Sequence, residues 1–467
     1  DNLLFFAENN KANLLRNRII NYKAEEILPL SEKAKSSAIT GRLNYFISLN
    51  ENQEATPFNI NDSILFYQNL YETFSKSIEK KYPKIYRLKY GEVPLSARQI
   101  QKQLPKDYTF LEYCNDGTTY YCLAVSKNHI TYKICGNKHR ADSLIATNQQ
   151  LITNKHYNTG ISHQLFKILL PQSLHENLLV SADGRIYDVP FDALSCNREQ
   201  PDYVLYKHRV QYVFSAGTYF NHQPPVENKR IISFYPDFTN SPYAVLNNSE
   251  EHDALKLFSN YNVYHKQNAV KENFIAQCNT SGIIHIASHL ITDTLSPLKS
   301  FLVFQPDSSN YSLSINEIWK LKTNCQLITL ASCQSNFGKY QNGEGIQNFA
   351  WAFHYAGARN ILSTEWNASD KSTSAIISDF YRNLKNGKNK QEALQLAKIN
   401  YLQKTDAIGA QPFFWSNFYL YGDETALTIS PSFLVKFWWM PVFLLLLCYL
   451  AMVIIRKVYS KKQYDHL

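Results

Sequence analysis

The sequence predicts an α/β protein in which a parallel or mixed sheet carries helices on its faces. Beyond residue 176, short apolar runs typical of buried strands alternate with longer stretches of helical spacing. A small antiparallel meander is expected before this sheet, several helices before the meander, and one membrane-spanning helix after the sheet. The chain of 467 residues has room for such a core, and 45% hydrophobic with 19% charged residues is typical of a folded protein.

The first segment, residues 1–87, is rich in Leu, Ile, Lys, Glu and Asn and contains few Gly or Pro. Apolar side chains recur at helical spacing, for example at Ile64, Tyr67 and Leu70. We expect several amphipathic helices here, as the end of a helical repeat array that lies largely upstream of Asp1. No repeat can be laid down twice within the segment, so the array itself is a hypothesis.

The second segment, residues 88–175, is expected to hold the meander together with helices. Aromatic or β-branched runs at 109–113, 119–125 and 130–134 are separated by Asp-Gly and Lys-Asn pairs, which favour tight hairpin turns. We expect these three strands to form a small sheet of their own.

The third segment, residues 176–428, is expected to form the α/β core. The predicted strands are 178–181, 231–234, 283–287, 327–331 and 360–364, and the predicted helices are 251–258, 345–355, 371–384 and 390–403.

Residues 433–455 are expected to form a single transmembrane helix, followed by a basic tail over 456–467. No charge occurs from 437 to 455, and this length spans a bilayer core of about 30 Å. Four Lys or Arg residues follow the span, so the positive-inside rule places the tail in the cytoplasm. We therefore expect a single-pass protein of the bacterial inner membrane, exported by a signal upstream, with its soluble part in the periplasm. A tail-anchored protein facing the cytoplasm is the alternative.

Charge and composition argue against several other classes of function. The net charge of +9 is modest and scattered, whereas a nucleic-acid-binding protein needs a clustered basic face. Gly343 and Gly345 lack the Lys-Ser/Thr of a phosphate-binding loop, so we expect no nucleotide and no other cofactor. The eight cysteines are dispersed without a C-x-x-C pair, which gives neither a disulfide framework nor a zinc ribbon.

Two predicted strands lead directly into reactive side chains. Residues 283–287 are followed by Ser288 and His289, and residues 327–331 are followed by Ser332 and Cys333. Sites form at the carboxyl ends of strands in open α/β sheets, and an imidazole within hydrogen-bond distance activates a thiol as a nucleophile. The alternative is structural, with Cys333 as a small buried apolar residue and His289 as a loop histidine.

Two further residues are weaker candidates. His285 lies four residues before His289 and could begin a zinc site, but no third ligand stands out, so we expect no metal and assign His285 to the packing of the sheet. Asp370 could line a pocket for a basic substrate side chain, or it could cap the helix that begins at Lys371.

Several motifs follow one another through the core in a fixed order. They are Leu330-Ala-Ser-Cys-Gln-Ser-Asn-Phe-Gly-Lys-Tyr-Gln-Asn-Gly-Glu-Gly345, Tyr355-Ala-Gly-Ala-Arg359, Asp370-Lys-Ser-Thr373 and Pro412-Phe-Phe-Trp415 with Tyr421-Gly-Asp423. In this order they resemble CHAT domains, the caspase-like peptidase domains found with tetratricopeptide repeats. The resemblance covers roughly 108–423. Ala7-Glu8 and Lys11-Ala12 resemble the helix that leaves a repeat array and enters such a domain.

The resemblance implies a CHAT domain over residues 88–428, with a caspase-like α/β/α sandwich and the activity of a cysteine endopeptidase. His289 would be the general base, Cys333 the nucleophile, and the backbone N–H groups of Leu290 and Cys333 the oxyanion donors. Substrates would be proteins cleaved at the membrane, with regulation by a partner bound through the N-terminal helical repeats.

One position departs from the family pattern, which usually has Gly directly after the catalytic His. Leu290 lacks the conformational freedom of Gly, and we expect its bulky side chain to face the cleft. This departure leaves a second hypothesis open, in which the domain is a catalytically inactive scaffold that binds a signalling partner.

Overall fold

The computed structural model describes residues 2–9, 11, 15, 28–51, 59–83, 95–220, 230–246, 249–293, 296–306, 310–332, 338–341, 345–366, 369–423 and 427. Cys333, the predicted membrane helix at 433–455 and the basic tail at 456–467 lie outside these residues. Within the described part of the chain, no helix is both long enough and apolar enough to cross a membrane.

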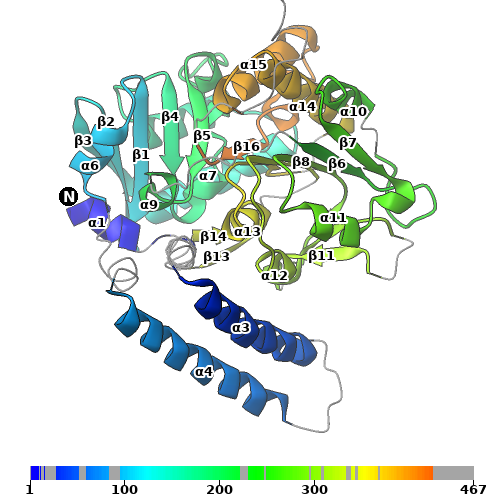
Figure 1. Ribbon diagram of the computed structural model, residues 1–467. Helices are drawn as coiled ribbons and strands as arrows, with labels where there is room; N and C mark the ends of the chain where they lie inside the picture. Colours follow the sequence, from blue (N-terminus) through cyan, green and yellow to red (C-terminus); the bar gives the residue numbers. More distant parts are fainter. Residues whose placement is uncertain are drawn as a thin grey trace, which may run out of the picture.

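An eleven-stranded mixed sheet runs through the molecule (Figure 1). Three neighbouring pairs are antiparallel, β1 with β2, β2 with β3, and β15 with β16, and the other neighbours are parallel. The predicted α/β class is confirmed. In spatial order the strands are β3 (Ile130–Asn137), β2 (Thr119–Ser126), β1 (Tyr108–Asn115), β4 (Asn177–Ser181), β5 (Arg209–Val213), β16 (Phe418–Tyr421), β15 (Ile361–Thr364), β12 (Leu327–Ala331), β8 (Ile283–Ala287), β6 (Ile231–Tyr235) and β7 (Tyr261–His265).

Helices cover both faces of the sheet because successive strand residues point to opposite sides and both sides are apolar. Ile284 and Ile328 face one helical layer, whereas Ile283 and Leu327 face the other. The first layer is α7 (Lys138–Thr153), α8 (Thr159–Leu169), α11 (Lys271–Gln277), α12 (Ile315–Ile318) and α13 (Phe349–Ala356). The second is α10 (Ser249–Leu255), α14 (Asp370–Lys385) and α15 (Lys390–Lys404), with α1 (Asn2–Asn9), α6 (Ala97–Gln103) and α9 (Ala216–Phe220) over the N-terminal strands.

The predicted meander exists, but the expectation that it forms a small sheet of its own is wrong. Strand β1 pairs in parallel with β4, with Thr109 opposite Leu178 and Leu111 opposite Val180. The three strands therefore continue the core sheet and form one of its edges. Side chains of β1 are buried on both faces, which a separate two-sided meander would not achieve.

The predicted helix at 345–355 is also corrected. Strand β14 (Gly345–Gln347) pairs with β13 (Lys339–Gln341), and α13 begins only at Phe349. The side chain of Asn348 caps this helix by accepting a hydrogen bond from the N–H of Trp351 at 2.8 Å. The glycine pattern therefore marks a short strand before the helix.

Helices α3 (Leu30–Glu51) and α4 (Ile60–Lys81) form a hairpin that projects from the body of the molecule (Figure 1). The rings of Phe46 and Tyr67 stack at 5.5 Å, and Lys81 pairs with Glu32 at 2.7 Å. The expectation of helices in this segment is confirmed for α1, α3 and α4. The upstream repeat array stays a prediction.

Candidate active site

The parallel pair β8 and β12 places two candidate positions at one edge of the sheet. Their register pairs Ala287 with Ala331, the last residue of each strand. His289 and Cys333 each follow two residues later in the sequence. Neighbouring strands lie about 4.8 Å apart, so the two segments leave the sheet side by side. Cys333 itself lies outside the described residues.

His289 is held by the loop that follows β6. Its Nε2 lies 2.6 Å from the carbonyl oxygen of Ala244, and its ring packs edge-on against Phe238 at 4.6 Å and is stacked with Tyr243 at 5.7 Å. A carbonyl oxygen only accepts hydrogen bonds, so Nε2 carries the proton. In the neutral ring, Nδ1 is then the nitrogen with a free lone pair, which is the requirement for a general base.

The sequence does not mark Ala244, Phe238 or Tyr243 as part of this site. The contact to Ala244 uses a backbone carbonyl, which every residue type carries, so no side-chain pattern marks it. The aromatic residues follow a predicted strand, at 231–234, and their position after its carboxyl end was the available signal.

Leu290 lies in β9 (Leu290–Ile291), the first strand of a three-stranded sheet with β10 (Phe301–Val303) and β11 (Ser312–Ser314). The expectation that its side chain faces the cleft is wrong, because it is 8% exposed and packs in the apolar core with Leu302. Among the described residues other than glycine, only Lys155 and Lys266 have positive φ. Leu290 therefore occupies a conformation that does not require glycine.

The backbone N–H of Leu290 points away from β10. Val303 donates its N–H to the carbonyl of His289 at 2.9 Å, so these two residues form a hydrogen-bonded pair. In an antiparallel ladder the next pair, Leu290 with Leu302, is then not hydrogen-bonded. Because β9 is the edge strand of this sheet in the described part of the chain, the N–H is directed to the side without a paired strand.

The segment that leads to Cys333 is buried and fixed. Ser332 is 5% exposed, and its carbonyl oxygen accepts a hydrogen bond from the Thr364 hydroxyl at the end of β15. Strand β15 is the other neighbour of β12, so three strand ends meet at this edge. The backbone immediately before Cys333 is thus anchored to the sheet.

The six described cysteines are poor nucleophiles. Burial raises the pKa of the Cys325 thiol to about 12 and that of Cys278 to about 11. Burial likewise raises the thiol pKa of the remaining four: Cys114, Cys122, Cys135 and Cys196. Since the thiolate is the reactive form, none of these six is activated near neutral pH.

His285 has a structural role on the opposite side of β8 from the core face that Ile284 occupies. It is fully buried, with Nε2 at 2.9 Å from the Glu251 carboxylate and Nδ1 at 3.2 Å from the Tyr381 hydroxyl. Its assignment to the packing of the sheet is confirmed. Within the described part of the chain, no group of three His, Cys, Asp or Glu side chains is placed to hold a metal ion.

Asp370 is the exposed first residue of α14, after the carboxyl end of β15. The alternative that it caps this helix is wrong, because Ser369 is the cap and accepts from the N–H of Ser372 at 3.4 Å. Asp370 instead sits in the first turn, where a carboxylate interacts favourably with the helix dipole.

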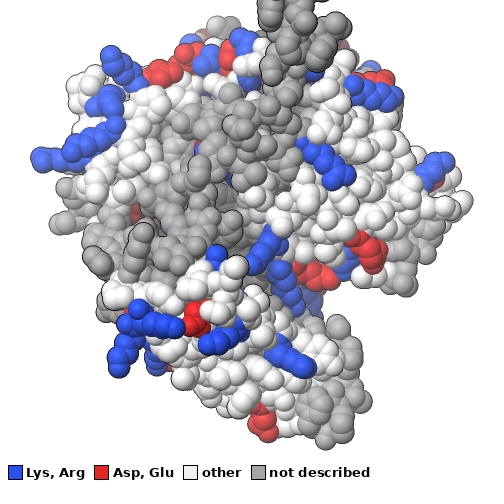
Figure 2. All heavy atoms as spheres, in the orientation of Figure 1, with Lys and Arg blue, Asp and Glu red and all other residues white. Residues whose placement is uncertain are grey.

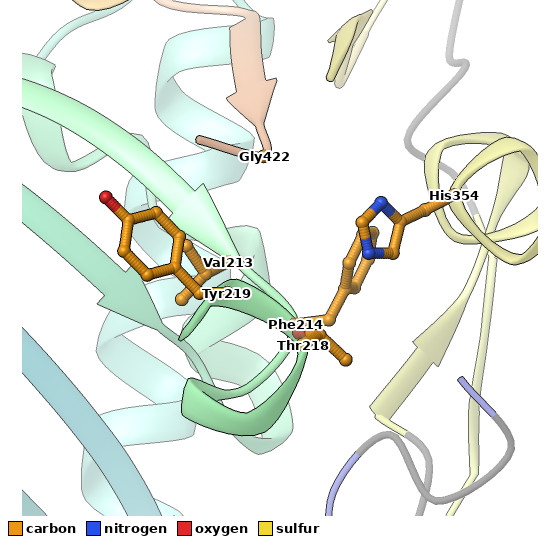
Figure 3. Close-up of a pocket in the computed structure, with 6 residues that line it drawn as sticks. All are labelled: Val213, Phe214, Thr218, Tyr219, His354 and Gly422. Atoms are coloured by element: carbon orange, nitrogen blue, oxygen red, sulfur yellow. The ribbon is translucent and has the colours of Figure 1, made fainter. Parts of the chain in front are cut away.

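A small pocket between β5, α9 and α13 is separate from this edge (Figure 3). The ring of His354 faces Phe214 across it, with ring centroids 5.2 Å apart. It is lined by Val213, Phe214, Thr218, Tyr219, His354 and Gly422.

Comparisons with known proteins bear on the whole core. The CHAT domain family model matches residues 144–423, which is more than half of the chain. A search of curated proteins found no significant match. The separase–securin complex of Saccharomyces cerevisiae is structurally similar with a TM-score of 0.45 at 9% identity, over 79% of this chain and 34% of that chain.

Two further structures are similar at a lower level. The Arg-specific cysteine proteinase gingipain R gives a TM-score of 0.38 at 9% identity, over 61% of this chain and 69% of that chain. The complex of Porphyromonas gingivalis RgpB pro- and mature domains gives 0.37 at 10% identity, over 61% and 70%. The present chain thus spans about a third of the separase chain and about two thirds of the gingipain chains.

Proposed function

This chain belongs to the CHAT domain family, and on that premise we propose that it is a cysteine endopeptidase with a His289–Cys333 dyad. The observation that carries the proposal is the register of β8 and β12. Ala287 pairs with Ala331 at one edge of the sheet. His289 follows Ala287 by two residues in the sequence, and Cys333 follows Ala331 by the same number. A base and a thiol on adjacent strand ends are the components of nucleophilic catalysis.

The reaction would be acyl transfer in two steps. The Cys333 thiol gives its proton to Nδ1 of His289, and the thiolate attacks the carbonyl carbon of the scissile peptide. The tetrahedral intermediate collapses, the C–N bond breaks, and the leaving amine takes the proton from the imidazolium. Water then attacks the thioester, transfers a proton to His289 and releases the acid with regeneration of the thiol.

The oxyanion would be held by backbone N–H groups of Leu290 and Cys333. The outward N–H of Leu290 at the β9 edge supports the first of these donors. The buried Leu290 side chain also removes the main reason for an inactive scaffold, which was a bulky group in the cleft. The proposal therefore favours the enzyme over the scaffold.

The test is covalent labelling with a library of electrophilic peptide probes. We expect capture at Cys333 in the wild type, loss of capture in Cys333→Ala, and at least a hundredfold slower capture in His289→Ala, as for removal of a general base. Cys196→Ala is the matched control, because Cys196 is the only partly exposed thiol among the described cysteines and reports non-specific labelling. If Cys333 is not captured even when protein partners are supplied, the catalytically inactive scaffold becomes the favoured function.

The proposal extends to a pocket for a basic substrate side chain, with Asp370 as its acidic residue. Its support is the exposed position of Asp370 after β15, the strand next to β12. Probes with Arg or Lys before the scissile bond should then label Cys333 faster than probes with Leu. Asp370→Asn should abolish that preference, and an unchanged preference would exclude the assignment.

Protein substrates and regulatory partners are proposed to bind through the N-terminal helices. The support is the α3–α4 hairpin, which projects from the body and exposes Leu65 by 56% and Phe66 by 60%. Replacing residues 28–82 with a flexible linker should impair cleavage of a folded protein substrate and leave small-probe labelling at Cys333 unchanged. Equal cleavage by both proteins would contradict this role.

Residues 433–455 are proposed to anchor the chain in the bacterial inner membrane, with the body in the periplasm. The support is the uncharged run from 437 to 455 and the basic tail that follows it. The full chain should resist alkaline extraction from membranes. A cysteine introduced into the tail should not react with a cysteine-specific label added outside intact cells. Labelling of that cysteine from outside would contradict the proposed topology.

A further inference from the structure

Strand β3 forms one end of the eleven-stranded sheet and exposes an apolar stripe. Ile130, Tyr132 and Ile134 are 40%, 74% and 61% exposed, and as alternate residues of one strand they share a face. Among the described strands, β2 is its one neighbour in this sheet. We call these three residues and their strand the β3 edge.

The same three residues direct their backbone polar groups outward. The N–H of Ser126 donates to the carbonyl of His129 at 2.8 Å, which makes this the first hydrogen-bonded pair of the β2–β3 ladder. Alternate pairs then lack hydrogen bonds, and these are Val125 with Ile130, Leu123 with Tyr132 and Tyr121 with Ile134. The N–H and C=O groups at 130, 132 and 134 therefore face away from β2.

The usual protection of a sheet edge is missing from this stripe. Exposed edges are commonly guarded by a lysine, a proline or a bulge. The lysine of β3, Lys133, turns to the other face, where its ammonium donates to the carbonyls of Lys167 and, at 2.7 Å, Leu170. The register shifts opposite Tyr120 and Tyr121, where Cys135 is the extra residue of β3, so this bulge lies just past Ile134, the last residue of the stripe. As far as the described part of the chain goes, the edge is thus open to an additional strand.

Charge decides which occupant fits. From Thr118 to Ala141 the chain holds four Lys or Arg residues and no Asp or Glu, and α6 alongside adds two more cations. Figure 2 shows Lys and Arg side chains at the left of the molecule, where α6, β2 and β3 lie in Figure 1. Lys127 precedes the strand and the exposed Arg140 follows it, whereas Lys138 is paired with Asp142 at 2.6 Å. Both ends of the β3 edge are therefore cationic.

We propose that the β3 edge binds an extended segment of a partner protein by strand addition, with alternating apolar residues and acidic residues at both ends. A second copy of this chain fits poorly, because antiparallel pairing would place Lys127 of one copy near Arg140 of the other. Main-chain hydrogen bonds would supply affinity, and the apolar stripe and flanking cations would supply specificity. Six strands separate β3 from β12, so this surface lies roughly 30 Å from the proposed dyad.

The experiment uses the full chain and a short fluorescent peptide that alternates Val and Thr between pairs of Glu. We expect saturable binding by fluorescence anisotropy, with affinity at least about tenfold weaker when the Glu pairs are replaced by Lys. N-methylation of the alternate backbone amides that face β3 should weaken binding to a similar extent, because it removes the donors of strand addition.

Two matched variants localise the effect. Tyr132→Lys should weaken binding of the Glu-flanked peptide about tenfold, since it replaces the most exposed apolar residue of the stripe. Tyr206→Lys makes the same change at a tyrosine that is 49% exposed outside β3 and should leave binding unchanged. Thermal unfolding of both variants should match the wild type, which shows that neither effect is loss of fold.

Three results would overturn the proposal. One is equal binding of the Glu-flanked and Lys-flanked peptides, and another is unchanged binding to Tyr132→Lys. The third is self-association of the wild type that Tyr132→Lys abolishes, because the occupant would then be a second copy of the chain. If neither peptide binds, the two peptides are again equal, and the proposal is overturned in the same way.

Discussion

At the residue scale, the side chain and the backbone N–H of Leu290, the residue after His289, have separate roles. The side chain packs in the core against the β10 layer, and the N–H faces the open edge. We predict that Leu290→Gly lowers the free energy of unfolding by about 3 kcal/mol, since a buried leucine is removed. Labelling of Cys333 by a peptide probe should change by less than about threefold, because the N–H is retained.

Urea unfolding and labelling rates measure the two effects separately. Leu302→Gly is the control, since Leu302 is the buried cross-strand neighbour and should cost a similar free energy of unfolding. A large gain in labelling rate without loss of stability in Leu290→Gly would mean that the leucine obstructs the cleft.

His354 makes the stability of the fold depend on pH. Burial lowers the pKa of its imidazole to about 4, while the Nδ1–H donates to the carbonyl of Ala358 at 3.0 Å. An unfolded histidine takes up its proton near pH 6.5, so below that pH the unfolded chain binds more protons than the folded one. Stability should therefore fall as the pH drops from about 6.5 to about 4.

We predict that His354→Asn removes part of this loss, on the order of 2 kcal/mol given that the residue as a whole is not fully buried. Asparagine keeps a donor for Ala358 and does not titrate. Urea unfolding at pH 7 and at pH 4.5 gives the difference for each protein. The control is His129→Asn at an exposed histidine, which should leave the pH dependence of stability as in the wild type. If His354→Asn showed the same pH dependence as the wild type, the assignment to His354 would be contradicted.

At the element scale, α1 and the nearby Lys11 are part of the core. The Glu8 carboxylate accepts hydrogen bonds from the N–H groups of Ala216 and Gly217 at 2.7 and 2.8 Å. Lys11 is 3% exposed and its ammonium binds the Glu112 carboxylate on β1 and the Ser181 hydroxyl on β4. Just after α1, Lys11 is therefore joined to β1 by a buried ion pair and to β4 by a hydrogen bond.

We predict that Lys11→Met costs about 4 kcal/mol of unfolding free energy, because it leaves a buried carboxylate without its cation. Burial already raises the pKa of the Glu112 carboxyl, against the opposing effect of Lys11. Without Lys11 the folded pKa rises further above the unfolded value, so the folded state binds more protons and the variant should lose stability as the pH rises above about 4.5.

Denaturant unfolding at pH 5 and pH 8 measures this trend. The double variant Lys11→Met with Glu112→Gln should recover most of the lost stability, since no charge is then buried. A cost that is the same at both pH values would mean that packing of the lysine stem, and not its charge, holds α1 in place.

The sequence predicted those elements that are buried on one side, because burial on one side sets the spacing of their apolar residues. Helix α14 was predicted within one residue at each end, because Ile376, Phe380 and Leu384 recur at helical spacing and all are buried. Strand β5 was missed because it buries a polar residue, Gln211, and β7 because most of its residues face solvent at the sheet edge. Such strands owe their place to neighbours, which the local sequence does not encode.

The candidate site likewise contains residues that the sequence could suggest and contacts that it could not. His289 and Cys333 became candidates because each follows an apolar strand in the sequence, and their roles stay predictions. The hydrogen bond from His289 to Ala244 could not be predicted, because it joins a side chain to a carbonyl 45 residues away. Long-range backbone contacts leave no residue-type signal, although this contact decides which imidazole nitrogen would be free to act as the proposed base.

At the scale of the whole molecule, the continuous sheet makes the N-terminal strands and the core one cooperative unit. The family match begins at residue 144, after β3, yet β4 pairs with β1 over the whole length of β4, and β1 buries Phe110 and Leu111 on opposite faces. We predict that hydrogen exchange of the full chain gives β1 and β4 amides the same free energy of opening, within about 1 kcal/mol, because neither strand can open without exposing both layers.

A fragment of residues 144–423 tests the same coupling by removal. It lacks β1 and therefore exposes the edge of β4, and it leaves Leu178, Leu179 and Val180 without the residues opposite them. We expect this fragment to lack a cooperative urea transition and the full chain to show a single one. If the fragment folded cooperatively and β1 exchanged much faster than β4 in the full chain, residues before 144 would be a separable domain. In that case the β3 edge would belong to a module that can move relative to the proposed dyad.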